Sequence, residues 1–383
     1  MSLLAKLYTE DHRIFRDSLR KYLENNVTPH VEEWEKNGIV PKQAWRDFGA
    51  QGYLCPWLPE EYGGSGVGFE YSVIILEELG RTNHTGLATP LHSDVIVPYL
   101  YTFGNDRQKK EWLPGCASGE IITAIAMTEP NAGSDLASIR STAIKDGNDY
   151  IINGQKTFIS NGINCDLCIV AAKTDPKADP PYTGVSLIVV EDGTPGFNKG
   201  KKFDKIGMKS QDTAEMFFED CRVPQSNLLG EEGAGFKYLM EKLQQERLIA
   251  SWASQIAAEM ALQVTIEYAK SREAFGRPLS RFQHIGFTLA EMATEVELGR
   301  TFIEKITIDH IEKRSVVKEV SMAKYWIAEM ANRIAQQGVQ IHGGYGYMEE
   351  YPIARIFRDT RVHTIYAGTS EIMKLIITRM MGL

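Results

Sequence analysis

One carboxylate of the chain falls among apolar residues at helical spacing. Six residues share this stripe: Leu239, Leu243, Glu246, Ala250, Ala253 and Ala257. Burial strips water from a carboxylate and raises its pKa towards neutrality, which suits a general base near pH 7. The spacing alone leaves other readings open: a buried glutamate held by a cation such as Arg247, or one at the exposed margin of the stripe.

The segment Ile125–Asp135 is a second candidate for chemistry. The apolar run 121–127 reads as a short buried strand that breaks into a loop at Pro130. The loop offers backbone N–H groups, the hydroxyls of Thr128 and Ser134, and a glycine, Gly133, that permits close approach of the backbone. It therefore suits an anion or the edge of a flat heterocycle, although an ordinary exit from a strand has the same pattern.

Arginines and glycines mark three further segments. Residues 271–283 carry three arginines in a loop between helices, and because arginine binds phosphate bidentately, pyrophosphate is a natural guest there. Gly343 and Gly344 let the backbone approach a ligand. Gly368 and Thr369 resemble the start of a helix, with Thr369 as the N-cap, and helix N-termini attract phosphate. Each segment could instead be a solvated loop.

Cys165 and Cys168 form a C-x-x-C pair, which can indicate redox chemistry or half of a zinc site. The pair lies in a strand-like run with no second pair, so we expect structural thiols. The eight histidines form no H-E-x-x-H pattern, and we predict no metal site.

The elements that must position these residues divide the chain in three. Helical periodicity begins after Thr9, a predicted N-cap, and gives a helical domain over 1–120. Strand-like runs, with Asn153-Gly154 as a predicted hairpin turn, give a middle antiparallel β-barrel or sandwich over 121–235. Long amphipathic helices fill 236–383. The predicted fold class is α+β.

The composition excludes several partners. With 383 residues and a net charge of -8, the chain is an acidic globular protein, which argues against nucleic acid or an anionic membrane. No apolar run approaches the roughly 18 residues of a membrane span, and the N-terminus does not read as a signal peptide. We expect a cytoplasmic bacterial protein or, in a mature eukaryotic form, a protein of the mitochondrial matrix.

Four motifs in order make the chain resemble the acyl-CoA dehydrogenase family of flavoenzymes, most closely its long-chain and isovaleryl branches. The motifs are residues 126–135, 156–162, 272–276 and 340–344. The resemblance runs essentially end to end. It implies the three domains above, with a C-terminal four-helix bundle, a homotetramer, and FAD bound between the β-domain and the bundle.

The resemblance also assigns roles to residues. In the β-domain it implies FAD contacts from Ile125, Met127, Thr128, Gly133, Ser134, Phe158, Ile159 and Ser160. It implies contacts to the FAD of a neighbouring subunit from Arg272, Phe275, Phe282, Gln283, Gln340, Gly343 and Gly344. Thr369 and Glu371 would flank the adenosine and pyrophosphate. The substrate would meet Ser134, Arg247, Ala367 and Gly368.

One position departs from most of the family. The catalytic glutamate usually precedes the Gly-Thr pair, where this chain has Ala367. The long-chain and isovaleryl branches carry the base in a Glu-Arg-Leu run on the first long helix of the C-terminal domain. That run here contains Glu246, the residue that periodicity already singled out. We therefore expect Glu246 to be the base.

The resemblance implies α,β-dehydrogenation of an acyl-CoA to the trans-2-enoyl-CoA. Glu246 would remove the α-proton, flavin N5 would take the β-hydride, and an electron-transfer flavoprotein would accept the electrons. A ribityl hydroxyl and the N–H of Ala367 would polarise the thioester. The alternatives are an acyl-CoA oxidase that uses oxygen and a catalytically silent acyl-CoA-binding protein. Asp94 could act as a second base at the acyl end of the pocket, but an N-cap is the expected role.

Overall fold

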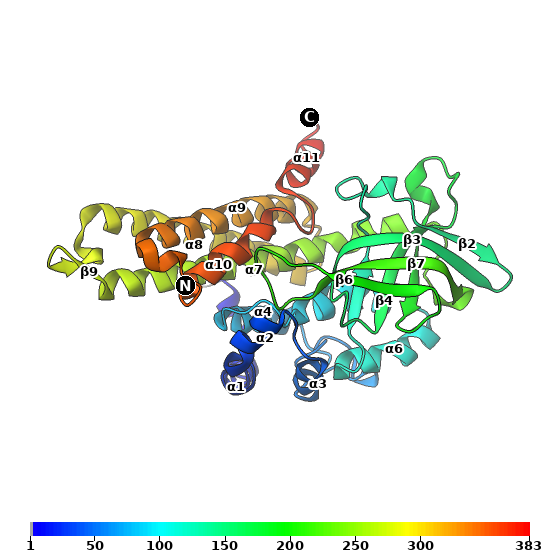
Figure 1. Cartoon of the computed structure of the whole chain (residues 1–383), viewed down its shortest axis with the longest axis horizontal. Coiled ribbons are helices and arrows are strands. Elements are labelled where there is room, and N and C mark those ends of the chain that lie inside the picture. The colour runs from blue at the N-terminus through cyan, green and yellow to red at the C-terminus, as the bar shows by residue number, and fades with distance from the viewer. Residues whose placement is uncertain (1–2) are drawn as a thin grey trace.

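The computed structural model describes residues 3–383, which run from helices through a sheet to long helices (Figure 1). The sheet lies at one end of the molecule and the long C-terminal helices at the other. The N-terminal helices pack beneath both (Figure 1).

Local sequence signals set the ends of the N-terminal helices. Thr9 is the N-cap of the first helix, as predicted, and the Asn105 side chain caps the sixth by accepting from the Gln108 N–H at 3.0 Å. A π-helical turn, Leu91–Ile96, leads into the fifth. The helices are α1 (Glu10–Asn26), α2 (Val31–Asn37), α3 (Lys42–Ala50), α4 (Phe69–Arg81), α5 (Val97–Phe103) and α6 (Asp106–Ser118).

The described part of the middle region forms one eight-stranded sheet of order β6-β7-β3-β2-β4-β5-β8, with β1 beside β4. Most pairs are antiparallel, as expected, but β4 runs parallel to β1 and meets β2 in parallel. The strands are β1 (Thr123–Ala126), β2 (Thr142–Asp146), β3 (Asp149–Ser160), β4 (Leu167–Lys173), β5 (Val185–Glu191), β6 (Phe197–Lys202), β7 (Thr213–Pro224) and β8 (Leu228–Leu229).

The predicted hairpin turn at Asn153-Gly154 is wrong. β3 continues through both residues, and the turn lies at Gly147, between β2 and β3. Pairing with β7 slips at this point, and the Asn153 side chain is bonded to Asp220 across the bulge. A Cβ at Gly154 would come within 2.2 Å of Ser141 Oγ, so close packing, rather than a turn, calls for glycine there.

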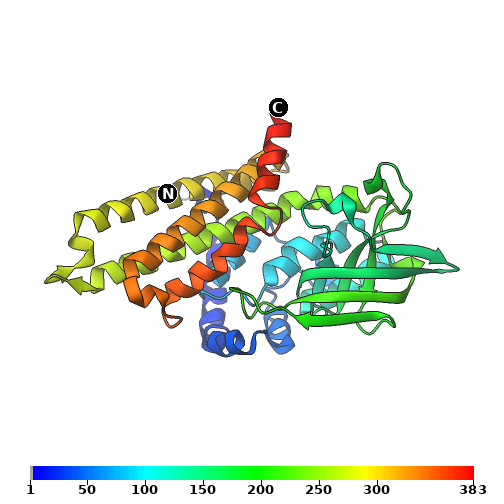
Figure 2. The same cartoon turned by 45° about the horizontal axis from the view of Figure 1, so that its top comes forward.

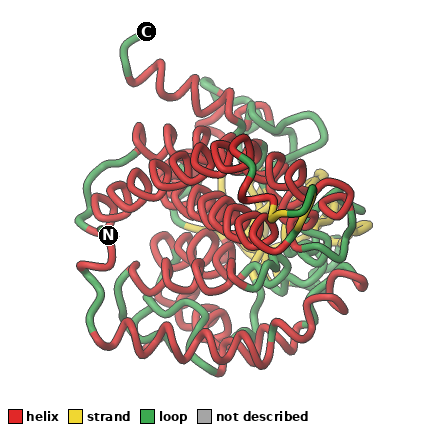
Figure 3. Tube along the Cα trace, turned by 90° about the vertical axis from the view of Figure 1, so that its left-hand side faces the viewer, coloured by secondary structure: helices red, strands yellow, loops and turns green. Residues whose placement is uncertain are grey.

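The C-terminal helices form the expected bundle, with α7 against α8, α9 and α10, and α11 packs against α9 before its end projects outward (Figures 1 and 2). Figure 3 shows the helices from the bundle end, in front of the sheet. A small hairpin, β9 (Glu273–Ala274) with β10 (Arg277–Pro278), joins α7 to α8. The helices are α7 (Gly235–Ser271), α8 (Gln283–Ile311), α9 (Val317–His342), α10 (Pro352–Thr360) and α11 (Ser370–Met380).

One apolar core holds these parts together and fixes α7. Buried side chains from α5, from strands β4 and β5, and from α7 and α9 belong to a single cluster that includes Trp252, Leu187 and Ile327. The α7 helix is therefore packed against the N-terminal helices on one side and the bundle on the other. Within residues 3–383, no helix has the length and apolar character needed to span a membrane.

Candidate active site

Glu246 lies on the buried side of α7, and only 6% of its surface is exposed to solvent. The Tyr99 hydroxyl, on α5, donates to Glu246 Oε1 at 2.6 Å. Burial raises the pKa of Glu246 to about 7, although the Tyr99 hydrogen bond and the charge of Arg247 act in the opposite direction. The predicted burial of this carboxylate is confirmed, and the group is poised to exchange a proton near neutral pH.

Arg247 is buried beside this carboxylate. Burial lowers the pKa of Arg247, while Glu246 and Tyr99 oppose that effect. Its Nε has no hydrogen-bond partner among the described residues. A buried N–H without a partner is costly, so this donor is available to a ligand.

Asp94 is not an N-cap, and that prediction is wrong. It lies inside the π-helical turn that Pro90 precedes, and the Ser72 hydroxyl donates to its carboxylate at 2.6 Å. Burial raises the pKa of Asp94 to about 7. Gln245 Nε2 donates to the Asp94 carbonyl, which ties this turn to α7 next to Glu246. A second acidic side chain thus lies buried on the element adjoining the base.

The turn before α11 places Ala367 in the left-handed region, with φ 52°, and Gly368 follows at φ 95°. Thr369 is the N-cap of α11, as predicted, because its Oγ1 accepts from the Ile372 N–H at 3.3 Å. Glu371 is exposed in the first turn of that helix. Ser370 Oγ is buried and has no partner among the described residues. The helix start therefore offers a buried hydroxyl beside its own N-terminal N–H groups.

A buried ion pair anchors the loop that follows β1. Lys156, on β3, is 0% exposed; its Nζ donates to Glu129 Oε1 at 2.9 Å and to the Met127 carbonyl at 3.1 Å. The Thr157 N–H donates to the Thr128 carbonyl at 2.9 Å. These bonds join the end of β1 to β3, so the two motifs in the β-domain form one surface.

That surface combines exposed and buried residues. Phe158 is 65% exposed with φ 59°, and Phe203 lies beside it at a ring distance of 5.2 Å. Ile125 is half-buried, and Gly133 and Ser134 are exposed in the loop. Two of the predicted residues lie on β3. The Ile159 side chain lies in the core of the sheet, so only its backbone can face a ligand. Ser160 pairs with Thr213 of β7. An exposed ring beside an open loop suits a flat heterocycle.

A separate pocket of about 540 Å³ lies at the far tip of the bundle. Its lining includes Arg272, Gly343 and Gly344, and the Arg272 guanidinium lies 5.5 Å from the centre of the Tyr345 ring. A Cβ added at either glycine would meet no described atom within 4 Å, so the space before them is open. Phe275 is 95% exposed at the hairpin tip. Gln283, Phe282 and Gln340 lie at the adjoining ends of α8 and α9.

The structure does not bring the two groups of predicted cofactor residues together. The sheet surface and the bundle tip lie at opposite ends of the chain (Figures 1 and 2). A ligand that touches both groups would have to lie between two copies of the chain.

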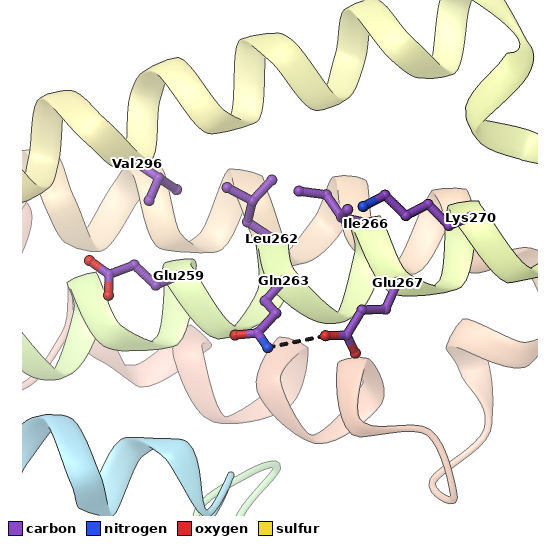
Figure 4. Close-up of a pocket in the computed structure, with 7 residues that line it drawn as sticks. All are labelled: Glu259, Leu262, Gln263, Ile266, Glu267, Lys270 and Val296. Atoms are coloured by element: carbon purple, nitrogen blue, oxygen red, sulfur yellow. Dashed lines mark hydrogen bonds between the residues drawn. The ribbon is translucent and has the colours of Figure 1, made fainter.

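A second hollow, of about 310 Å³, lies between α7 and α8 (Figure 4). None of the predicted site residues lines it. Its lining residues are Glu259, Leu262, Gln263, Ile266, Glu267, Lys270 and Val296.

The thiols carry no chemistry in this arrangement. Cys165 and Cys168 are free and buried, in agreement with the structural role expected of them. Burial raises the pKa of Cys165 to about 12. Within residues 3–383, no cluster of histidine, cysteine and acidic side chains could hold a metal ion.

Sequence reasoning missed Tyr99, Lys156 and Lys324. Lys324 is buried on α9 and donates to the Gly368 carbonyl. It occupies an apolar stripe with Val320 and Ile327, so the spacing rule that found Glu246 could also have found it. Tyr99 left no such signal, because a tyrosine is unremarkable in an apolar run.

Comparison with known proteins covers nearly the whole chain. Family models described as acyl-CoA dehydrogenase N-terminal, middle and C-terminal domains match residues 9–120, 124–221 and 233–382. The long-chain specific acyl-CoA dehydrogenase of Sus scrofa is 46% identical over 98% of this chain and 87% of its own. The isovaleryl-CoA dehydrogenase of Pongo abelii is 38% identical over 97% and 88%. A crystal structure of an acyl-CoA dehydrogenase from Geobacillus kaustophilus matches with a TM-score of 0.97 and 56% identity over 98% and 99%.

The raised pKa of Glu246 predicts a pH-dependent stability. An unfolded glutamate releases its proton near 4.5, whereas the folded one holds it to about 7. The contribution of this group is therefore present below pH 4.5 and is lost as pH rises to 7, by on the order of 3 kcal/mol. Chemical denaturation at about pH 4 and about pH 8 should show Glu246→Gln gaining stability over wild type at the higher pH. The exposed Glu267→Gln should show no such gain; equal behaviour of the two variants would contradict the burial argument.

The ion pair in the β-domain predicts a second stability effect. Lys156→Met leaves Glu129 charged and buried, so it should cost about 3–5 kcal/mol and speed amide exchange over residues 128–141. Lys145→Met, which breaks a surface ion pair with Glu232, should cost under about 1 kcal/mol. Similar losses in both variants would show that the Lys156 pair does not anchor the loop.

Proposed function

Because the chain belongs to the acyl-CoA dehydrogenase family, we propose that it oxidises an acyl-CoA thioester to the trans-2-enoyl-CoA with Glu246 as the base. Family membership makes the chain a flavoprotein oxidoreductase of fatty acid metabolism that acts on acyl-CoA. The base, the electron acceptor and the assembly are the proposed parts.

The observation that carries the proposal is the buried Glu246 carboxylate, whose pKa burial raises to about 7. Ala367 cannot accept a proton, so the turn before α11 offers no base at that position. The hydrogen bond from Tyr99 occupies Oε1 and leaves Oε2 to take the α-proton. Glu246 removes this proton as a hydride leaves the β-carbon of the substrate.

An α-proton is a weak acid, so the charge that develops on the thioester oxygen must be stabilised. The backbone N–H of Ala367 is independent of its side chain and remains available as a donor. One such donor contributes about 3 kcal/mol to the transition state. Arg247, whose Nε has no partner among the described residues, adds positive potential beside Glu246.

The residues present suit FAD. An exposed Phe158 ring beside the open loop at Gly133 fits a flat ring system, and the pocket of Arg272, Gly343 and Gly344 fits a pyrophosphate or its neighbouring sugar. When bound, FAD supplies the hydride acceptor. Met127, Thr128, Ser134, Phe158 and Ser160 would hold its β-domain side, whereas Thr369 and Glu371 would flank the adenosine part.

The distance between the cofactor residues of the β-domain and those of the bundle tip supports a cofactor that two copies of the chain share. In this proposal the bundle tip of one copy, with Arg272, Phe275, Phe282, Gln283 and Gln340, reaches the cofactor of another, within a homotetramer. An electron-transfer flavoprotein takes the electrons after each turnover.

The proposal predicts a selective chemical defect. Glu246→Gln keeps the size and the Tyr99 contact but removes the proton acceptor, so flavin reduction by acyl-CoA should slow by at least roughly a hundredfold. Stopped-flow bleaching over a panel of straight, branched and cyclic thioesters measures this rate and reveals the preferred acyl group.

The matched control is Glu267→Gln, an exposed residue of the same helix, which should reduce flavin at the wild-type rate. Normal bleaching by Glu246→Gln would remove Glu246 from the role. A colourless wild-type protein that still binds CoA esters would favour the silent binding protein, and rapid reoxidation by air would favour an oxidase.

The shared cofactor yields a further prediction. Arg272→Ala should lower the flavin-to-protein absorbance ratio, although Arg272 lies at the opposite end of the chain from the β-domain surface. Arg314→Ala, which removes an exposed arginine elsewhere on the bundle, should retain full flavin. Full flavin content in Arg272→Ala after dialysis would contradict binding across copies.

A further inference from the structure

Lys324 is a buried lysine with no carboxylate within ion-pair distance among the described residues. It lies on the apolar stripe of α9, and 1% of its surface is exposed. Within residues 3–383 its Nζ forms no ion pair, and the charge of Glu371 acts on it only from a longer distance. Burying an ammonium without a counter-ion is costly, so its contacts should explain what holds it there.

The hydrogen bond and the aromatic contact of the Lys324 ammonium both lie at the turn before α11. Its Nζ donates to the Gly368 carbonyl at 2.5 Å and lies 5.7 Å from the centre of the Tyr366 ring. Burial, reinforced by the charge of Arg247, lowers the pKa of Lys324 to about 7. The ammonium therefore contacts the residues on either side of Ala367.

The backbone that Lys324 holds is strained. Ala367 has φ 52°, a left-handed conformation that costs a residue with a Cβ about 1 kcal/mol, and Gly368 continues the turn at φ 95°. The Thr369 cap fixes the far side of this turn on α11. The hydrogen bond from α9 supplies the restraint on the near side.

We propose that Lys324 is a positioning residue that holds the Tyr366–Gly368 turn so that the Ala367 N–H can bind the thioester oxygen of the substrate. The inference rests on the proposed function, in which that N–H is an oxyanion donor. Under this inference, the side chain of Lys324 on α9 sets the orientation of the Ala367 N–H.

The charge of Lys324 serves the same step. Before proton transfer, Glu246 carries the negative charge beside Arg247; afterwards it is neutral and the charge lies on the thioester oxygen. Arg247 stays positive through this change, and the protonated form of Lys324 adds a second positive charge. Fixed positive charge next to the oxygen favours the state with charge on the substrate, and preorganisation means that no reorientation is needed.

The test measures polarisation of the bound carbonyl rather than turnover. A 3-thiaacyl-CoA labelled with ¹³C at the thioester carbonyl cannot lose a β-hydride, and its carbonyl stretch is read by infrared difference spectroscopy in the FAD-loaded protein. Wild type should shift the stretch to lower frequency than in water. Lys324→Met should lose most of that shift in the bound fraction, and Lys324→Gln, a neutral donor, should lose part of it.

Lys374→Met is the matched control, because this exposed lysine of α11 pairs with Glu329 and not with the Tyr366–Gly368 turn. It should keep the wild-type stretch. If Lys324→Met does not fold, the smaller shift expected of Lys324→Gln decides the matter. A wild-type shift that both Lys324 variants retain overturns the inference, since a merely structural lysine would alter how much ligand binds but not its carbonyl. An unshifted carbonyl in wild type would instead defeat the proposed oxyanion contact itself.

Discussion

The apolar side chains around Glu246 replace its water, and the rest of the site compensates for that loss. Desolvation raises the pKa of the carboxyl to about 7, the Tyr99 hydroxyl stabilises its charged form, and Arg247 adds positive charge. This balance exists only because α7 is packed between α5 and the bundle in one continuous core.

The second constraint is the separation of the residues that suit the cofactor. On the β-domain surface, a buried ion pair joins Lys156 to Glu129, 27 residues earlier in the chain. The pocket with Arg272 lies at the far tip of a 37-residue helix. Long helices thus place half of a binding site where a single chain cannot use it, which makes assembly a requirement for function in the proposed account.

The sequence predicted those features that depend on spacing within one element. Periodicity located Glu246, and local residue chemistry located the Thr9 and Thr369 caps. The sequence predictions failed where the role of a residue depends on its neighbours in space. Asn153-Gly154 has the composition of a turn but forms a bulge against β7 and Ser141. Asp94 was expected to cap a helix, but it is hydrogen-bonded to Ser72 on another helix. The position of Lys324 on an apolar stripe could have indicated that it is buried, but its hydrogen bond to the Gly368 carbonyl could not be predicted. Tyr99 could be found only from the packing of α5 on α7.

The central claim is that Glu246 moves the α-proton. Hydrogen exchange tests it without any oxidation: a 3-thiaacyl-CoA carrying deuterium at its α-carbon is incubated in water with the FAD-loaded protein, and loss of the label is followed by mass spectrometry. The account predicts that wild type releases the label at a rate that rises with pH through about 7, as the carboxyl loses its proton, and that Glu246→Gln retains it. Release of the label by Glu246→Gln at the wild-type rate would contradict the account.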